Sequence, residues 1–378
     1  MADLLVVGTG LIGTSVGLAV AGTRDVVLQD HDREHLTAAV GRGAGRPWDG
    51  TERVVHVVLA VPPSQIASEL LKLQTLGIAK TYSHVASVQA MVQVDVETIG
   101  CQTSNVCGTH PMAGAELPGP ELATASLFWG RPWLLCPGPT TSPAALSAAQ
   151  DLALACGALL VEQTADEHDR TVALVSHLPQ VAASALAAML RDHAAEVALS
   201  GPGLRDTTRI AASDPRLWQD VLLRSAPHLA PLVARLAEEL LQVARALAEA
   251  AGSSAGGSSA GGSSAGGSSA GPGEVLRELL QHGREGRALV PVKRGGTDSD
   301  FISVDISVPD EPGRLAALLA VAAQAGVNVE DVSVDHLPGR PTGVISLVVT
   351  RAQQGLLHGC LRDRGWTVLG AATATPTE

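Results

Sequence analysis

A histidine beside a sharp backbone break is the first residue in this sequence that could do acid–base chemistry. His110 opens the stretch HPMAG, residues 110–114, in which a proline and a glycine oppose both helix and strand. Because the pKa of histidine is about 6.5, a neutral ring can accept a proton from an alcohol while a hydride leaves. A lone histidine in a tight turn is more often structural, so the neighbouring motifs must decide.

A glycine-rich loop near the N-terminus indicates a nucleotide site. The stretch VVGTGLIGTS places Gly8, Gly10 and Gly13 in a G-x-G-x-x-G pattern between an apolar run and a helical pattern. Glycines there permit a tight turn, the approach of a pyrophosphate and close packing of the helix on the strand. Asp30 follows about 20 residues later, where an acid bonds the ribose hydroxyls and repels a 2′-phosphate, favouring NAD over NADP. A glycine-rich turn followed by an unrelated acid is the alternative.

These candidates need a sheet to position them. Over residues 1–162, amphipathic stretches alternate with the β-branched runs LLVVG, DVVLQD, VVHVVLAVP, TYSHVAS and NVCGTH. This alternation is typical of a mostly parallel sheet covered by helices, a Rossmann-type α/β domain. Ligands bind at the carboxyl edge of such a sheet, where His110 and the stretch LAVPPS would lie. Cofactor contacts are therefore also expected from Leu11, Ile12, Val61 and Pro62.

Three further kinds of segment follow the α/β domain. Residues 163–251 lose the β pattern and carry Ala, Leu, Arg and Glu at helical spacing, which predicts an all-helical domain. Residues 252–273 contain GSSAG four times and then Pro-Gly, which predicts a flexible linker. We expect residues 274–298 to form a connecting helix and loop, and residues 299–378 to form a small ferredoxin-like βαββαβ domain.

The composition limits the class of protein. With 46% hydrophobic residues among 378, the chain is expected to form packed domains. The net charge of −12 argues against nucleic acid or an anionic membrane as the main partner. Five cysteines without a CxxC pair predict reduced thiols and no metal site. We find neither a signal peptide nor an apolar run of membrane-spanning length, which predicts a cytoplasmic protein.

Four motifs in this order resemble the prephenate dehydrogenase family: GTGLIGTS, GTHPMAGAE, DEHDRTVALVSHLPQ and RDTTRIAASDPRLW. The resemblance spans residue 3 to about residue 245. It implies an NAD-dependent oxidoreductase that removes hydride from prephenate and releases carbon dioxide, giving 4-hydroxyphenylpyruvate for tyrosine biosynthesis. It further implies that His110 accepts the hydroxyl proton, that Ser87 hydrogen-bonds this histidine and the nicotinamide end of the cofactor, and that Arg209 clamps a substrate carboxylate.

Other residues that match the family have open alternatives. The resemblance implies a cleft wall of His168, His177 and Gln180, although buried histidines bonded within the protein fit nearly as well. Glu116 resembles a gating acid that pairs with the arginine, or is a solvated loop carboxylate. Trp218 matches a residue that the family presents across a dimer interface, or packs in the core. The family pairs through its helical domain, so a homodimer is expected.

The sequence departs from the family pattern at three places. Relatives often read Asp-Val-Gly-Ser-Val-Lys where this chain reads HVASVQ, with His84, Ala86 and Gln89 around the serine. This difference puts the local geometry of Ser87 in question. Gln180 replaces a histidine that many relatives have near the substrate side chain, which could alter the keto-acid preference or inhibition by tyrosine. The repetitive linker is the third departure.

The C-terminal stretch VPDEPGRLAALLAVAAQAGVNVEDV resembles the ACT domain, a small regulatory fold that binds amino acids. The resemblance implies a ligand site at a strand-to-helix turn, whose free N–H groups could hold a carboxylate. The expected effector-binding residues are Asp310, Glu311, Pro312, Gly313 and Asn328. Tyrosine or phenylalanine is the logical effector. A ferredoxin-like dimerisation module with an empty turn is the alternative.

Three other functions compete with this interpretation. Arogenate dehydrogenase, or a dual cyclohexadienyl dehydrogenase, would apply the same chemistry to a substrate with an amine in place of the keto group. A non-catalytic sensor of NAD and amino acids would not need His110, Ser87 and Arg209 together. A dehydrogenase of small hydroxy acids shares the glycine loop but does not account for SHLPQ and TTRIA. The sequence therefore favours a prephenate dehydrogenase with a tethered regulatory domain.

Overall fold

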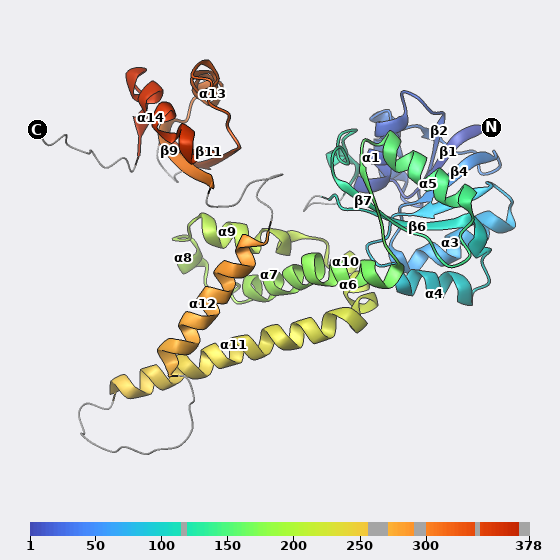
Figure 1. Cartoon of the computed structure of the whole chain (residues 1–378). Coiled ribbons are helices and arrows are strands. Elements are labelled where there is room, and N and C mark those ends of the chain that lie inside the picture. Colours follow the sequence, from blue (N-terminus) through green and yellow to red (C-terminus); the bar gives the residue numbers. More distant parts are fainter. Residues whose placement is uncertain (115–118, 256–270, 291–299, 337–340, 370–378) are drawn as a thin grey trace, which may run out of the picture. The chain divides into compact units, whose positions relative to one another are not determined.

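The computed structural model describes residues 1–114, 119–255, 271–290, 300–336 and 341–369. The chain divides into two compact units, Met1–Glu238 and Glu239–Glu378. In the first unit, a twisted sheet with helices on both faces is followed by a helical segment (Figure 1).

The first unit is built on an eight-stranded sheet in the order β3-β2-β1-β4-β5-β6-β7-β8. The strands are β1 (Ala2–Val7), β2 (Val26–Gln29), β3 (Arg46–Pro47), β4 (Val54–Leu59), β5 (Thr81–His84), β6 (Val106–Pro111), β7 (Pro132–Cys136) and β8 (Leu159–Glu162). Neighbouring strands are parallel, with an antiparallel pair at β6 and β7. The first six follow the order of doubly wound dinucleotide-binding sheets, which confirms the predicted Rossmann-type fold.

Helices cover both faces of this sheet. They are α1 (Leu11–Val20), α2 (Arg33–Gly41), α3 (Pro63–Thr75), α4 (Ala90–Thr98) and α5 (Pro143–Ala155), with short turns η1 (Thr103–Asn105) and η2 (Pro120–Leu122). Apolar residues of α3 and α4 form one core cluster with the strands, and those of α1, α2 and α5 form the other. The sheet is therefore buried on both sides, as its near-continuous apolar strands require.

The helical segment of the first unit begins with a capping box. The Thr164 hydroxyl accepts from the Glu167 backbone N–H at 3.3 Å, and the Glu167 carboxylate accepts from the Thr164 N–H at 2.9 Å. The elements are α6 (Ala165–Val172), η3 (Ala173–His177), α7 (Leu178–Ala188), α8 (Ala194–Val197), α9 (Pro202–Thr208), η4 (Arg209–Ala212), α10 (Pro215–Arg224) and α11 (Ala226–Ala255), which continues past the end of the first unit at Glu238. This run of helices confirms the predicted helical segment.

The structure corrects two expectations about this region. α11 continues to Ala255 and so includes the first four residues of the expected linker, while residues 256–270 of that linker lie outside the described residues. The stretch Ala165–Ala188 is 24 residues long and apolar enough, by length and composition, to cross a membrane, so the expectation that the chain has no such stretch is wrong. Asp169 of this stretch accepts hydrogen bonds from the backbone of the nucleotide-binding part, which attaches the stretch to the folded unit.

The second unit contains the predicted βαββαβ arrangement. After α12 (Pro272–Ala288) come β9 (Phe301–Pro309), α13 (Arg314–Gln324), β10 (Asp331–His336), β11 (Thr342–Thr350), η6 (Arg351–Gln353), α14 (Gln354–Asp363) and β12 (Thr367–Val368). The sheet is antiparallel in the order β10-β11-β9-β12, and alternate residues of β9 and β11 pack against α13 and α14. α12 begins at Pro272, two residues earlier than expected, and residues 291–299 lie outside the described residues.

Candidate active site

The glycine loop after β1 has the close contacts of a nucleotide-binding turn. Gly8 has a φ of +94°, and a Cβ there would lie 2.5 Å from the carbonyl oxygen of Ala60. A Cβ on Gly13 would lie 1.9 Å from the carbonyl oxygen of Gly8, so helix α1 can pack on the loop only with glycine. A Cβ on Gly10, in contrast, would meet no described atom within 4 Å. The open side of the loop is therefore at Gly10 and the N-terminus of α1, where a pyrophosphate would fit.

Asp30 is fixed against this loop. Its Oδ2 accepts from the backbone N–H of Thr9 at 2.6 Å and from the Thr9 hydroxyl at 2.9 Å, while Oδ1 accepts from the N–H of Asp32 at 2.9 Å. Val61 and Pro62 lie where β4 leads into α3, and Cγ1 of Val61 would be 3.1 Å from a Cβ on Gly8. The expected cofactor contacts Leu11 and Ile12 form the first turn of α1. These residues together line the turn that a dinucleotide would occupy.

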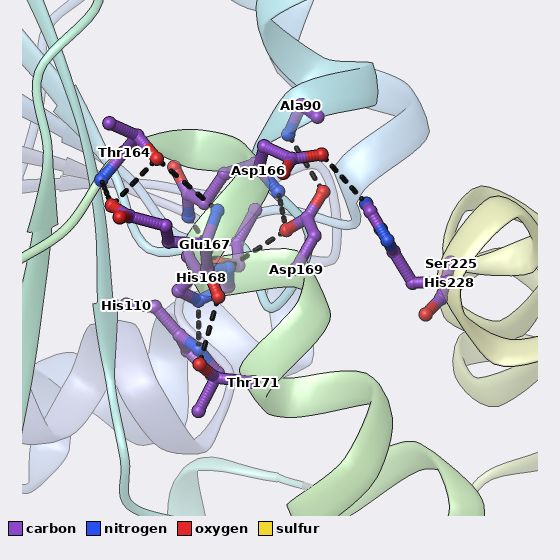
Figure 2. A network of polar contacts seen from close by, with 12 residues as sticks. Ala90, His110, Thr164, Asp166, Glu167, His168, Asp169, Thr171, Ser225 and His228 are labelled. Atoms are coloured by element: carbon purple, nitrogen blue, oxygen red, sulfur yellow. Dashed lines mark hydrogen bonds and ion pairs between the residues drawn. The ribbon is translucent and has the colours of Figure 1, made fainter. Parts of the chain in front are cut away.

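His110, His168 and Asp169 form a continuous line of hydrogen bonds (Figure 2). Nδ1 of His110, near the end of β6, lies 2.9 Å from Nε2 of His168 on α6. Nδ1 of His168 in turn lies 2.8 Å from Oδ1 of Asp169. His168 and Asp169 are buried, whereas His110 keeps partial exposure. His110 is thus the member of this line that a ligand can reach. His168 uses both ring nitrogens within the protein, a different role from the cleft wall that the resemblance implied.

The carboxylate of Asp169 lies at the N-terminus of α4. Oδ1 accepts from the backbone N–H of Gln89 at 2.7 Å, and Oδ2 accepts from that of Ala90 at 2.9 Å. Because α4 begins at Ala90, these N–H groups have no partner inside the helix. The N–H groups and the helix dipole both stabilise negative charge at this position. The contact joins α6 to the turn between β5 and α4, and holds an ionised carboxylate beside His168.

A wide helical turn brings His177 toward the same site. Ala173–His177 form a π-helical turn between α6 and α7, and Pro179 follows in the first turn of α7. Proline lacks an N–H and crowds the carbonyl four residues earlier, which a wider turn relieves. In a regular helix of about 3.6 residues per turn, His168 and His177 would point to opposite sides. The extra residue in the π turn reduces this angular offset.

His177 is buried, and only one of its two ring nitrogens has a hydrogen-bond partner among the described residues. Its Nδ1 lies 2.8 Å from Oγ of Ser225, and its ring packs edge-on against Trp218 with centroids 5.9 Å apart. Nε2 of His177 is buried without a hydrogen-bond partner among the described residues. Such a nitrogen is costly unless a ligand or water bonds it, so His177 remains a candidate ligand contact. Trp218 is partly buried against the core of its own chain.

Burial keeps His84, His110 and His177 neutral. Burial lowers the pKa of His110 well below 6.5, and any positive charge on His168, His177 or His84 would lower it further. Burial also lowers the pKa of His84 to about 4 and that of His177 to about 4. His110 is therefore unprotonated at pH 7, which is the form that can accept a proton.

The residues that depart from the family pattern belong to the turn after β5. The carbonyl of His84 accepts a hydrogen bond from the Thr109 hydroxyl at 2.7 Å, and Nδ1 of His84 accepts one from the N–H of Ala86 at 3.4 Å. Ser87 follows, is partly exposed, and makes no side-chain hydrogen bond within the described part of the chain. The bond between Ser87 and His110 that the resemblance implied is therefore not formed, and His110 bonds His168 instead.

The remaining predicted residues lie outside β6 and α6, which carry His110, His168 and Asp169. Arg209 begins η4, is exposed, and η4 packs against α7. Gln180 of α7 is buried, with Nε2 3.4 Å from Oγ of Ser184. Glu116 lies outside the described residues. The expected effector-binding residues Asp310, Glu311, Pro312, Gly313 and Asn328 are all exposed on the second unit.

Asp169, Thr9 and Ser225 bond to candidate site residues but were not predicted from the sequence. Asp169 had a usable signal, because an acid directly follows a candidate histidine in DEHD. Thr9 and Ser225 had none, since hydroxyl residues are frequent in loops and at helix ends.

Comparison with known proteins gives two matching families. The family described as prephenate dehydrogenase, nucleotide-binding domain, matches residues 18–162, and the prephenate dehydrogenase dimerization domain matches residues 164–254. A probable prephenate dehydrogenase of Streptomyces niveus, NovF, is 35% identical over 377 residues, covering 97% of this chain and 99% of the relative. A cyclohexadienyl dehydrogenase of Zymomonas mobilis is 28% identical over 265 residues, covering 66% of this chain and 89% of the relative.

A solved structure shares the fold. It is prephenate dehydrogenase from A. aeolicus, in complex with hydroxyphenyl propionate and NAD+. The TM-score is 0.60 at 24% identity, with coverage of 76% of this chain and 97% of that one.

Proposed function

This chain belongs to the prephenate dehydrogenase family of oxidoreductases, and from this premise we propose that it converts prephenate to 4-hydroxyphenylpyruvate with NAD. The observation that carries the proposal is the similarity to the Streptomyces niveus relative, which runs through 97% of this chain and 99% of that one. The partly exposed His110 near the end of β6 supplies a proton acceptor suited to this reaction.

The reaction balances with a single proton acceptor. The proton of the ring hydroxyl moves to His110, and the C–O bond becomes a carbonyl as hydride leaves the same carbon. NAD, when bound, accepts that hydride. The bond to the ring carboxylate then breaks, carbon dioxide leaves, and its electron pair completes the aromatic ring as a phenolate. The phenolate takes the proton back from His110, so the protein needs to hold it only transiently.

The residues of the glycine loop fit NAD. Gly10 leaves the approach to α1 open, and Gly13 allows the helix to start close to the loop. Asp30 would meet the adenine ribose hydroxyls and repel a 2′-phosphate, which favours NAD over NADP. NAD+ in the A. aeolicus relative supports the same cofactor.

For the substrate, we assign the predicted family roles to residues of the helical segment and the turn before α4. Arg209 would pair with a carboxylate, and Nε2 of His177 offers an unused hydrogen-bonding position. Ser87 would contact the nicotinamide end of the cofactor, and Gln180 the substrate side chain. Trp218 packs beside His177. Glu116 keeps its proposed role as a gating acid.

We assign a regulatory role to the second unit. Its βαββαβ order and the exposed turn between β9 and α13 support an ACT domain that binds tyrosine or phenylalanine.

The match to a dimerization domain supports a homodimer through the helical segment. A cytoplasmic location accords with the free thiols of all five cysteines.

The second candidate is an arogenate or dual cyclohexadienyl dehydrogenase, favoured by the Zymomonas mobilis relative. The test compares NADH or NADPH formation with prephenate and with arogenate, in all four pairings, on the full chain. Turnover of prephenate with NAD at a rate well above the other pairings is expected. Equal rates on both substrates would make the protein a cyclohexadienyl dehydrogenase, and turnover of neither would refute the proposal.

A further inference from the structure

We propose that Asp169 and His168 are positioning residues that fix the tautomer of His110, so that Nε2 of His110 is the atom that accepts the substrate proton. The inference rests on the proposed function of His110 as the proton acceptor. It concerns two buried residues that do not touch the substrate and act through a third.

The argument begins at Asp169, whose two oxygens accept hydrogen bonds from the N–H groups of Gln89 and Ala90. A protonated carboxyl would lose acceptor capacity at the N-terminus of α4, where negative charge is stabilised. The carboxylate is therefore ionised and can only accept hydrogen bonds. The contact of 2.8 Å to Nδ1 of His168 then requires that this nitrogen carry the hydrogen.

The same reasoning passes through His168 to His110. A neutral imidazole with its hydrogen on Nδ1 has a lone pair on Nε2. Nε2 of His168 lies 2.9 Å from Nδ1 of His110, so beside a neutral His168 the Nδ1 of His110 donates. The lone pair of His110 is then on Nε2. One ionised carboxylate determines, through two rings, which nitrogen of His110 is the base (Figure 2).

The line of groups also stabilises the proton after transfer. A proton arriving on Nε2 makes His110 a cation, whose Nδ1 hydrogen bond to His168 strengthens because the donor is charged. Asp169 supplies the only carboxylate in this line. The other titratable groups that face His110 are His84 from β5 and His177 from η3, and both are neutral at pH 7, so neither stabilises its charge. His110 can therefore hold the proton briefly and release it readily to the product.

The direct test is the tautomer of His110 in the unliganded wild-type protein, measured by nuclear magnetic resonance with ¹⁵N-labelled histidine. His110→Asn assigns its signals by their loss. At pH 7 we expect His110 to be neutral with its hydrogen on Nδ1, and His168 to have the same form. A hydrogen on Nε2 of His110 would overturn the inference, whatever the protein does with prephenate.

Asp169→Asn tests the origin of this tautomer. An amide NH₂ group facing Nδ1 of His168 would move the His168 hydrogen to Nε2, which would then donate to Nδ1 of His110. His110 would keep a hydrogen on Nε2, and kcat should fall at least about a hundredfold while KM changes little. The matched control is Asp166→Asn on the same helix, whose carboxylate is exposed and pairs with Arg170 and His228.

The outcomes separate the two proposals. Unchanged tautomers and unchanged kcat in Asp169→Asn would refute a positioning role. Failure of this variant to fold would leave the decision to the wild-type spectrum, which needs no substitution at Asp169. A wild type with the expected tautomer but without prephenate turnover would contradict the proposed function and leave the positioning inference intact.

Discussion

The side-chain amide of Gln89 donates a hydrogen bond to the backbone carbonyl of Thr109 at 2.9 Å, at the residue that precedes His110. The same amide donates to the carbonyl of Ala86 at 2.7 Å, and the backbone N–H of Gln89 donates to Asp169 at 2.7 Å. One residue thus joins the turn after β5, the end of β6 and the helix that carries His168. Gln89 is therefore a buried structural connection.

Replacing Gln89 with alanine should destabilise the first unit. The change leaves two buried carbonyl oxygens without this donor, at a cost of about 1–3 kcal/mol in the free energy of unfolding. Urea denaturation followed by circular dichroism measures the loss. Gln93→Ala is the matched control, because its amide bonds the exposed carboxylate of Glu97 on the same helix. Equal stability of the two variants would contradict the structural role of Gln89.

The features predicted from the sequence depend on local patterns. The strands around the glycine loop follow from runs of apolar residues, and Gly8 and Gly13 follow from a turn that excludes a Cβ. The small βαββαβ unit can also be predicted from the sequence, because β9 and β11 alternate buried and partly exposed residues. In each case a short-range pattern in the sequence corresponds directly to a local requirement of the structure.

The features not predicted depend on long-range contacts. The partner of His110 is 58 positions away along the chain, so no local pattern distinguishes His168 from Ser87 as that partner. The π turn at Ala173–His177 changes the helical register, which the regular period of 3.6 residues cannot indicate. Gly-Ser-Ala composition likewise suggested a linker from residue 252, whereas α11 extends to Ala255 because an established helix propagates at low cost.

Two glycine substitutions should separate the packing of the loop from its ligand contact. Gly13→Ala places a Cβ 1.9 Å from a backbone oxygen, so the protein without ligand should lose stability. Gly10→Ala meets no described atom within 4 Å, so its stability should match that of the wild type. Its NAD affinity should still fall about tenfold, or about 1.4 kcal/mol, because the methyl group occupies the approach to α1. Thermal unfolding and NAD titration calorimetry measure the two effects. Wild-type NAD affinity in Gly10→Ala would contradict the assigned cofactor position.

The stability of the first unit should decrease as pH falls. Burial lowers the pKa of His56 from 6.5 to about 3, while Nδ1 and Nε2 lie 2.9 Å and 2.8 Å from the Thr81 and Ser83 hydroxyls. Between these pH values the unfolded chain binds a proton that the folded chain does not. The free energy of unfolding therefore falls with decreasing pH across this window, by up to about 1.4 kcal/mol per pH unit for this histidine.

His84 and His177 act in the same direction, between pH 6.5 and about 4. Below pH 6, His56→Gln should reduce the slope of the unfolding free energy against pH by the amount that corresponds to uptake of about one proton on unfolding. The measurement is urea denaturation at a series of pH values. His193→Gln, which removes a histidine that solvent already reaches, provides the control. An unchanged slope in His56→Gln would contradict the burial of a neutral His56.

Replacing His110 with asparagine should stop the chemical step without emptying the site. Asparagine preserves a polar side chain of similar reach but cannot accept a proton, so kcat should fall by at least about a hundredfold. Prephenate affinity should remain within about threefold, about 0.7 kcal/mol, because the proposed carboxylate contact of Arg209 is untouched. NADH formation gives kcat, and calorimetric titration of the variant gives the affinity. His193→Asn controls for the loss of a histidine elsewhere in the same unit. Turnover at the wild-type rate in His110→Asn would assign the proton to another group, and lost binding with retained chemistry per bound substrate would make His110 a substrate contact.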